Sequence, residues 1–585
     1  MATFGRIGAL IFLNRCTRFS ISGWVFATKP PRRIVSATIF HRPAKDAFEL
    51  FLDPASSGNS ACGGFLALIL CLASPCETKK SRHHHHQVLI LPIVPVFDYN
   101  RARHFPRQSS LDMIRSFAFT LLFIAAVSAF SVSNIHAAKP NIIYILLDDA
   151  GYGDLSCYGQ QKFKTPNMDR LATEGMKFSD HYSGSTVCAP TRCSLLTGLH
   201  TGHTYVRGNR EVQPEGQAAM PDDIVTIPRL LKRAGYKTGA FGKWGLGAPD
   251  SPSDPVEHFD LFYGYNCQRE AHNYFPTHLW KNKERIELDG QTYSADLINK
   301  ATLDFIRESK DGPFFAYVAT PIPHAAMHAP ESYVAPFRKK FPQFEDKIGK
   351  YSGPLVKNPI AAFAGMMTLL DDHVGEILAL LKELDIDDNT IIMLTSDNGA
   401  HKEGGHDPVF FNSHGPFQGF KRDLYEGGIR TPLLARWPGK IKAGSESNLV
   451  SAHWDMLPTF CELAGANVPN LIDGISMVPT LMGEPEKQQP HEYLYWEFYE
   501  RGGKRAVRFG NWKAVQLNLH KNLNSPIEIY HLPDDLAEAN NVADKNPEQV
   551  KKAREFFKDA HIPSQFWKFD PKANKKKNKK NKKAA

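Results

Sequence analysis

The sequence predicts a large three-layer α/β sandwich with a mixed, mostly parallel sheet, followed by a small C-terminal antiparallel sheet packed with a helix. Residues 141–147, 314–320 and 390–396 are continuous apolar runs, typical of strands buried on both faces of a parallel sheet. Amphipathic stretches alternate with these runs, as strands and covering helices do in α/β domains. Beyond residue 492 the pattern changes to short alternating segments.

The amphipathic stretches repeat apolar residues at helical spacing. They span residues 167–174, 226–234, 294–308 and 362–384. The short C-terminal segments span residues 493–499, 504–510, 512–517 and 526–532, and a helix over 547–559 follows them. These patterns predict a catalytic domain over residues 139–490 and a small α+β subdomain over residues 491–570.

The net charge of +9 belongs to the two ends of the chain. Residues 1–112 carry 14 basic and 6 acidic side chains, and residues 572–583 contain eight lysines. The part between the ends is therefore acidic, which argues against a nucleic-acid-binding function. We expect residues 571–585 to be a disordered lysine-rich tail, with a tether to anionic cell wall or polysaccharide as the alternative.

Residues 113–138 are typical of a secretory signal peptide. Met113 and Arg115 precede an apolar run over residues 117–130, and an alanine-rich exit ends at Ala138. This run is shorter than the roughly 20 residues of a membrane-spanning helix. We therefore expect an exported protein, periplasmic or extracellular, without a transmembrane segment. Residues 1–112 are interpreted as a spurious or disordered extension upstream of the true start.

The most informative motif begins at Cys188 and reads CAPTRCSLLTG. Together with Asp148-Asp149-Ala-Gly upstream, it resembles the type I sulfatase family of the alkaline phosphatase-like superfamily, over about residues 139–544. The resemblance implies that a formylglycine-generating or sulfatase-maturating enzyme oxidises Cys188 to Cα-formylglycine, and that Arg192 holds the aldehyde hydrate. From the residues alone, a buried thiol or a disulfide to Cys157 or Cys193 stays open.

Sulfate-ester hydrolysis gives a physical reason for such a modification. The nucleophile must release sulfate after it has attacked. A geminal diol attacks sulfur with one oxygen and expels sulfate by collapsing through the other, which divides one difficult step into two. Serine and unmodified cysteine lack the second hydroxyl.

Acidic residues end two of the predicted strands. Asp148 and Asp149 follow one apolar run, and Asp397 and Asn398 follow another. Polar ligands of such sheets bind beyond the carboxyl ends of the strands. Carboxylate and amide oxygens suit calcium or magnesium, whereas helix capping by acids is the structural alternative. These four positions match the metal ligands of the sulfatase family, which implies one calcium ion per chain.

Three further residues match the sulfate-binding positions of that family. They are Lys243 in GKWGLG, His324 in TPIPHA and Lys421 in GFKRDLYEGG. A fixed lysine is a compact charge suited to an anion, and either His324 or Lys421 could protonate the leaving alcohol.

One position departs from the family pattern. The family reads GKWHLG, and its histidine helps to expel sulfate, but this chain has Gly245 at that place. His200 and His203, which follow the Cys188 motif, are the candidate substitutes. We also expect substrate contacts from four polar side chains: Arg207, Asn209, His203 and His414.

The predicted function is removal of sulfate from a sulfated saccharide, with galactose or N-acetylgalactosamine sulfates as the expected substrates. One alternative is a phosphodiesterase or phosphonate monoester hydrolase of the same superfamily. A non-catalytic carbohydrate-binding relative is a second, suggested by Gly245. A cationic adhesion protein is a third, and the acidic body of the chain argues against it.

Overall fold

The computed structural model describes residues 69–71, 88–90 and 139–571. The chain divides into two units, Met1–Asn134 and Ile135–Ala585. In the first unit, β1 (Ile69–Cys71) and β2 (Val88–Ile90) form an antiparallel pair. Apart from this pair, the expected extension over residues 1–112, the expected signal peptide and the lysine-rich tail from residue 572 lie outside the described residues.

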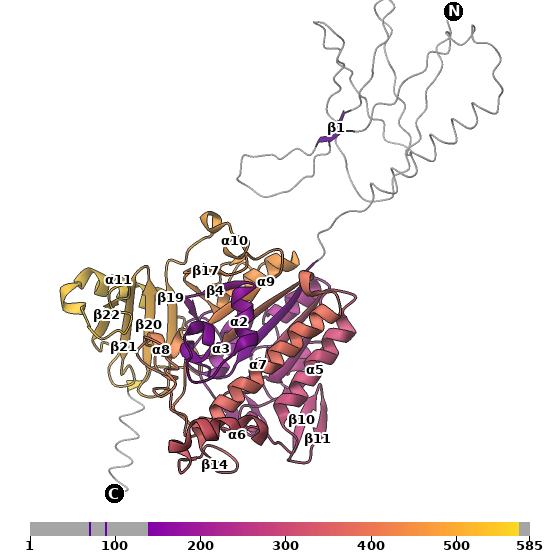
Figure 1. Ribbon diagram of the computed structural model, residues 1–585. Helices are drawn as coiled ribbons and strands as arrows, with labels where there is room; N and C mark the ends of the chain where they lie inside the picture. Colours follow the sequence, from indigo (N-terminus) through magenta and orange to yellow (C-terminus); the bar gives the residue numbers. More distant parts are fainter. Residues whose placement is uncertain (1–68, 72–87, 91–138, 572–585) are drawn as a thin grey trace, which may run out of the picture. The chain divides into compact units, whose positions relative to one another are not determined.

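The second unit is built on a ten-stranded mixed sheet (Figure 1). Its five central strands are parallel, and antiparallel strands flank them on both sides. In spatial order the strands are β11 (Glu284–Glu287), β10 (His278–Lys281), β9 (Leu261–Tyr265), β8 (Lys237–Lys243), β12 (Phe314–Ala319), β3 (Asn141–Leu147), β15 (Thr390–Ser396), β16 (Leu433–Arg436), β4 (Met176–Phe178) and β17 (Ser445–Ser447).

Two hydrophobic cores cover the two faces of this sheet. Along β3, Ile143 and Ile145 belong to one core, whereas Ile142 and Tyr144 belong to the other. This alternation follows from the two-residue period of a strand. The first core includes α2 (Pro166–Thr173), α5 (Ser294–Ser309), α6 (Glu331–Lys340) and α7 (Pro359–Glu383). The second includes α3 (Cys188–Thr197), α4 (Ile227–Arg233), α9 (Met456–Ala464) and α10 (Val478–Leu481).

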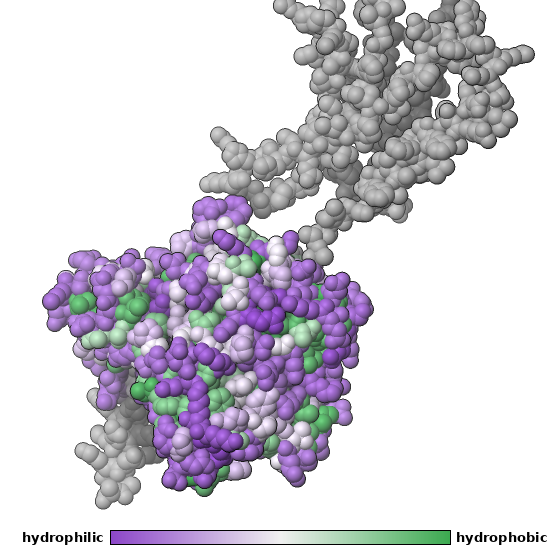
Figure 2. Space-filling model, in the orientation of Figure 1, coloured by the Kyte–Doolittle hydropathy of each residue, from purple (hydrophilic) through white to green (hydrophobic). Residues whose placement is uncertain are grey.

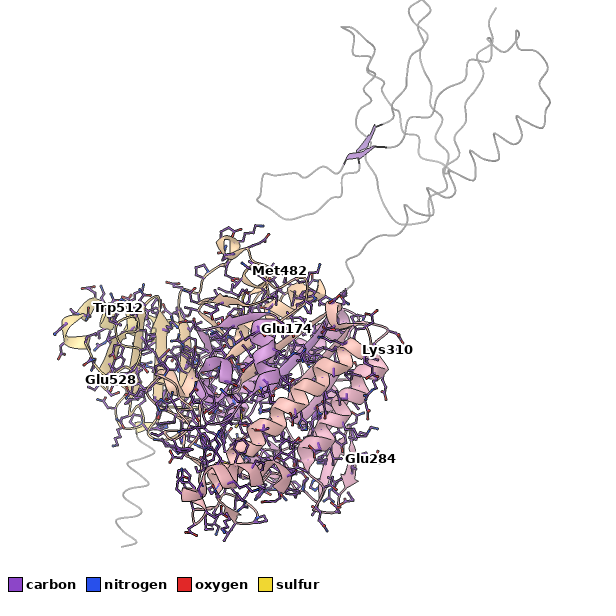
Figure 3. The ribbon with its side chains drawn as sticks, viewed as in Figure 1. Glu174, Glu284, Lys310, Met482, Trp512 and Glu528 are labelled. Atoms are coloured by element: carbon purple, nitrogen blue, oxygen red, sulfur yellow. The ribbon has the colours of Figure 1, made fainter. Side chains whose placement is uncertain are left out.

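The predicted C-terminal sheet is present as four antiparallel strands. They are β19 (Leu494–Phe498), β20 (Lys504–Phe509), β21 (Trp512–Leu517) and β22 (Ile527–His531). One face packs on α11 (Pro547–Asp559) through Tyr495 and Phe557, and the other packs on the large domain through Trp496 and Trp454. In Figure 3, Trp512 and Glu528 mark this sheet, far from Glu284 on β11.

Short elements complete the fold. They are the pairs β6 (Glu211–Val212) with β7 (Gly216–Gln217), β13 (Ile348–Gly349) with β14 (Val356–Lys357) and β18 (Ser451–Ala452) with β5 (His181–Tyr182), and the helix α8 (Glu426–Ile429). The face seen in Figure 2 is mostly hydrophilic, with hydrophobic residues scattered over it. None of the helices within the described ranges is both long and apolar enough to cross a membrane. The architecture confirms the predicted three-layer α/β sandwich with a separate small antiparallel sheet.

Candidate active site

Polar side chains follow four parallel strands at one edge of the large sheet. Asp148 comes directly after β3, and Asp397 comes after the neighbouring β15, where its N–H donates to the Leu147 carbonyl at 2.9 Å. Lys243 is the last residue of β8, and His324 lies five residues beyond β12. The carboxyl ends of adjacent parallel strands thus bring residues far apart in sequence to one place.

Cys188 is the first residue of α3 and faces this edge of the sheet. Its Sγ lies 3.4 Å from Asp148 Oδ1 and 3.3 Å from Lys243 Nζ, and the residue is only 2% exposed. Burial and the adjacent Asp148 carboxylate raise the pKa of the Cys188 thiol well above its ordinary value. The unmodified side chain is therefore a neutral thiol, which is a poor nucleophile.

Arg192 lies one helical turn after Cys188 and is completely buried. Its guanidinium donates through Nη1 to the Lys243 carbonyl at 2.6 Å and through Nη2 to Asp397 Oδ2 at 3.1 Å. Asp148 Oδ2 lies 3.7 Å from the same Nη2. Arg192 therefore fixes α3 against the ends of β8 and β15.

Asp149, Asp397 and Asn398 complete an oxygen-rich cluster beside Asp148. The Asp149 N–H donates to Asp397 Oδ1 at 3.0 Å, and Asn398 Nδ2 donates to Asp149 Oδ1 at 2.8 Å. All four side chains are fully buried, and Asn398 Oδ1 has no hydrogen-bond partner among the described residues. Three carboxylates and an unpartnered amide oxygen are donors that fit a hard divalent cation.

Lys421 and His324 form a pair on the Asp149 side of the cluster. Lys421 Nζ lies 2.6 Å from Asp149 Oδ2 and donates to His324 Nε2 at 2.9 Å. His324 Nδ1 lies 3.1 Å from the Ala325 carbonyl. These two contacts assign the histidine proton to Nδ1 and leave Nε2 as an acceptor.

The charges of the cluster keep Asp148 and Asp149 ionised and its histidine neutral, whereas burial and the neighbouring Asp148 carboxylate raise the pKa of Asp397 to about 7. Burial opposes ionisation of Asp148 and Asp149, but Lys243 beside the first and Lys421 beside the second lower both pKa values below the ordinary range. The same carboxylates raise the pKa values of the two lysines against the effect of burial. Burial and the Lys421 ammonium lower the pKa of His324.

The disulfide alternative for Cys188 is wrong. All five cysteines of the described residues are free, including Cys157 and Cys193. Cys193 Sγ instead contacts Thr204 Oγ1 at 3.0 Å. The buried thiol that the sequence left open is the form present in this unmodified chain.

The proposal that His200 or His203 replaces the missing family histidine is not supported. Both follow the far end of α3, a helix about 14 Å long from Cys188 to its last residue. His203 Nδ1 lies 2.8 Å from Asp473 Oδ1, and the two imidazoles stack with centroids 4.1 Å apart. Both rings thus lie beyond the opposite end of α3 from Cys188, and their printed contacts are with Asp473 and with each other.

Of the other residues expected to contact the substrate, Asn209 lies near Cys188, whereas Arg207 has a structural role. Asn209 lies next to Cys188 of α3, where its Oδ1 accepts the Ala189 N–H at 3.2 Å. Arg207 is 3% exposed and donates to backbone carbonyls and Glu497, which is a structural role and corrects the expectation. His414 contacts Phe420, the residue before Lys421, through ring centroids 5.1 Å apart.

The region between β9 and β10 supplies residues that the sequence did not single out. A Cβ atom on Gly245 would lie 3.2 Å from Gln268 Cγ and Nε2, so Gln268 occupies the space next to the missing family histidine. Four residues later, the His272 ring stacks on His324 with centroids 4.3 Å apart and planes 4° apart.

Tyr351, between β13 and β14, is also part of the site. Its ring packs edge-on against His272 and His324, with centroids 5.1 and 5.4 Å apart, and the residue is 37% exposed. Ser352 Oγ donates to the His272 carbonyl at 2.6 Å. Tyr351 and His272 thus connect the buried His324 ring with solvent.

Comparison with known proteins agrees with this geometry. Residues 140–466 match the sulfatase family, and residues 413–559 match the C-terminal part of N-sulphoglucosamine sulphohydrolase. The N-acetylgalactosamine-6-sulfatase of Rattus norvegicus is 34% identical over 67% of this chain and 74% of its own length. The N-acetylgalactosamine-6-O-sulfatase of Bacteroides thetaiotaomicron is 28% identical over 72% and 93%.

Solved structures lead to the same family. The crystal structure of Ps i-CgsB superposes with a TM-score of 0.63 at 27% identity, covering 74% of this chain and 96% of that one. The same protein has been solved with k-i-k-neocarrahexaose bound. With the family matched over more than half of the chain and the acidic, cationic and cysteine side chains gathered at one sheet edge, this chain belongs to the sulfatase family of sulfuric ester hydrolases.

Proposed function

We propose that this enzyme, which hydrolyses sulfate esters of carbohydrates, acts on N-acetylgalactosamine or galactose 6-sulfate, uses calcium and uses formylglycine made from Cys188. The observation that carries the proposal is the convergence of Cys188, three carboxylates and three cations within one buried cluster. The sugar comes from the N-acetylgalactosamine-6-sulfatases of Rattus norvegicus and Bacteroides thetaiotaomicron. Their 6-sulfated sugar is a galactose derivative.

Each group of side chains in the cluster has its own proposed role. Asp148, Asp149, Asp397 and Asn398 would hold the ion, which supplies positive charge for a sulfate oxygen. Oxidised Cys188 would supply a hydrate whose second hydroxyl allows sulfate to be released. Arg192 holds the start of α3 in place through the contacts described above.

Lys243 and Lys421 provide fixed positive charge for the remaining sulfate oxygens, at no reorganisation cost because ion pairs already hold them. His324 is neutral and its Nε2 accepts a hydrogen bond from Lys421, so Nε2 has no proton to give. Lys421 is therefore the proposed proton donor to the leaving sugar oxygen. His272 keeps the His324 ring in place by stacking and faces the sugar with Tyr351. Asn209, in the loop after α3, would contact the substrate beside Cys188, since its Oδ1 accepts the Ala189 N–H.

Export and maturation belong to the same proposal. Residues 113–138 would direct the chain out of the cytoplasm, and a separate formylglycine-generating or sulfatase-maturating enzyme would convert Cys188. Residues 139–490 and 491–570 would act as catalytic domain and supporting subdomain.

Two measurements test the proposal. The Cys188 peptide from natively produced enzyme should be about 18 Da lighter than the cysteine form, because an aldehyde replaces the thiol. The enzyme should then release sulfate from 6-sulfated N-acetylgalactosamine and leave the 4-sulfated isomer intact. Active enzyme with an unmodified thiol would refute the nucleophile, and preference for the 4-sulfate would refute the substrate.

A further inference from the structure

The C-terminal strap, residues 562–569, returns from α11 to the loop that follows the nucleophile helix. The Ile562 N–H donates to the Gly202 carbonyl at 3.1 Å, and Trp567 Nε1 donates to the Tyr205 carbonyl at 3.0 Å. The indole also lies on Gly208, where a Cβ atom would come within 2.7 Å of Trp567 Cζ3. Glycine at this position therefore lets the strap approach the loop closely.

This contact exposes aromatic surface rather than burying it. Tyr205 is 49% exposed and Phe566 is 63% exposed, although each is large and apolar. The Arg210 guanidinium lies 5.0 Å from the centre of the Phe566 ring. Exposed aromatic groups beside a functional site mark binding surfaces, and a guanidinium stacked on one of them stays available for an anion.

One loop, residues 205–210, contacts both the strap and the start of α3 next to Cys188. Residues 205–210 carry Tyr205 and Arg210, and Asn209 between them contacts the backbone N–H of Ala189, next to Cys188. The loop that carries Tyr205 and Arg210 is therefore held against the start of α3, next to Cys188.

We infer that Tyr205, Arg210, Phe566 and Trp567 form an accessory subsite for a sugar that neighbours the one being desulfated. This inference rests on the proposed function and defines its substrate as an oligosaccharide or polysaccharide. Aromatic rings bind the apolar face of a sugar, and Arg210 binds its sulfate or carboxylate. Charge supports the assignment, since Lys568 and eight lysines over residues 572–583 follow the subsite, and a sulfated glycan is a polyanion.

The experiment compares a small and a long substrate on matured, full-length enzyme. Phe566→Ala and Arg210→Ala are made singly and together, with Leu523→Ala, a 47% exposed position in the same subdomain, as the matched control. The substrates are 4-methylumbelliferyl sulfate and a chondroitin 6-sulfate tetrasaccharide. We expect the double variant to lose about tenfold in kcat/KM on the tetrasaccharide, through KM, and to keep its activity on the aryl sulfate.

Binding provides a second readout that does not require turnover. Titration of the tetrasaccharide into the Cys188→Ala protein should show the same loss of affinity in the double variant, and the loss should shrink at high salt. Equal losses on both substrates, or no loss on either, would overturn the subsite. So would a wild-type dimer that the double variant converts to monomers, since the surface would then bind a second copy of the chain. If wild type releases no sulfate from either substrate, it is the proposed function that fails.

Discussion

Replacement of Lys513 is expected to loosen the C-terminal sheet from the large domain. Lys513 on β21 is fully buried, and its Nζ lies 2.8 Å from Glu426 Oε1 and 3.1 Å from Glu538 Oε1. Glu426 begins α8, five residues after Lys421, and keeps a second cation in Arg430 at 3.0 Å. For Glu538, Lys513 is the one cation within ion-pair distance among the described residues.

The cost of Lys513→Met follows from these contacts. Removing one partner of a buried ion pair costs about 3–5 kcal/mol, because a charge stays behind without compensation. Burial already raises the pKa of Glu538, so its carboxyl group takes up a proton when Lys513 is lost, while Glu426 stays paired with Arg430. Both effects limit the loss, and we expect about 3 kcal/mol in free energy of unfolding.

Urea denaturation measures this difference, with Lys521→Met as control. Lys521 lies exposed in the turn between β21 and β22, so its loss should change stability by less than about 0.5 kcal/mol. The reasoning is refuted if Lys513→Met costs no more than this control. A measurable loss of sulfatase activity should accompany the destabilisation, because the segment from Lys421 to Glu426 connects the network to the site.

Three further perturbations test the site and its support. Chelation of divalent cations should abolish sulfate release and lower the melting temperature, and added calcium should restore both. Asp397→Ala should remove the calcium-dependent part of the melting temperature. An enzyme that is insensitive to the chelator would contradict the assignment of these residues as metal ligands. His272→Ala should lower kcat about 10- to 100-fold by freeing the His324 ring, while His272→Phe, which keeps the stacking, should recover most of it; equal losses would mean that the imidazole itself is needed. Burial raises the pKa of Asp154 from its ordinary 3.8 to about 7, so the stability that its protonated form contributes is complete below pH 4 and is lost as pH rises through 7. Asp154→Asn should remove this loss, which is worth at most about 4 kcal/mol in free energy of unfolding. Parallel pH profiles of stability for wild type and variant would contradict this prediction.

The sequence predicted the parts of the fold that depend on local periodicity. The apolar runs ending at Asp148 and Asp397 are β3 and β15, and their adjacency follows from parallel pairing of strands at the centre of the sheet. Helix boundaries agree within three residues, as for α7, expected from 362 and observed from Pro359. Convergence of the acids could be predicted because strand ends meet at one edge of a sheet.

The residues that the sequence missed reach the site from loops. His272 follows β9 and Tyr351 lies between β13 and β14, and neither position has a period or a spacing that relates it to Cys188. His200 and His203 show the opposite situation, and their proposed role as substitute bases stays a prediction. They are near Cys188 in sequence, but a helix of ten residues separates near neighbours along the chain by about 14 Å.

The balance of charge explains why so many ionised groups can be buried in one place. Asp148, Asp149 and Asp397 are buried with Arg192, Lys243 and Lys421, so three carboxyl groups face three cations, and burial raises the pKa of Asp397 to about 7. Burying any of these ions alone would cost several kcal/mol, but each carboxylate has a cation within 3.1 Å. A divalent cation among the carboxylates leaves a net positive site, which suits a dianion such as sulfate. In the proposed mechanism, the ion pairs that stabilise the fold would also hold Lys243, Lys421 and Arg192 in place to face an anion once the acids bind a metal ion.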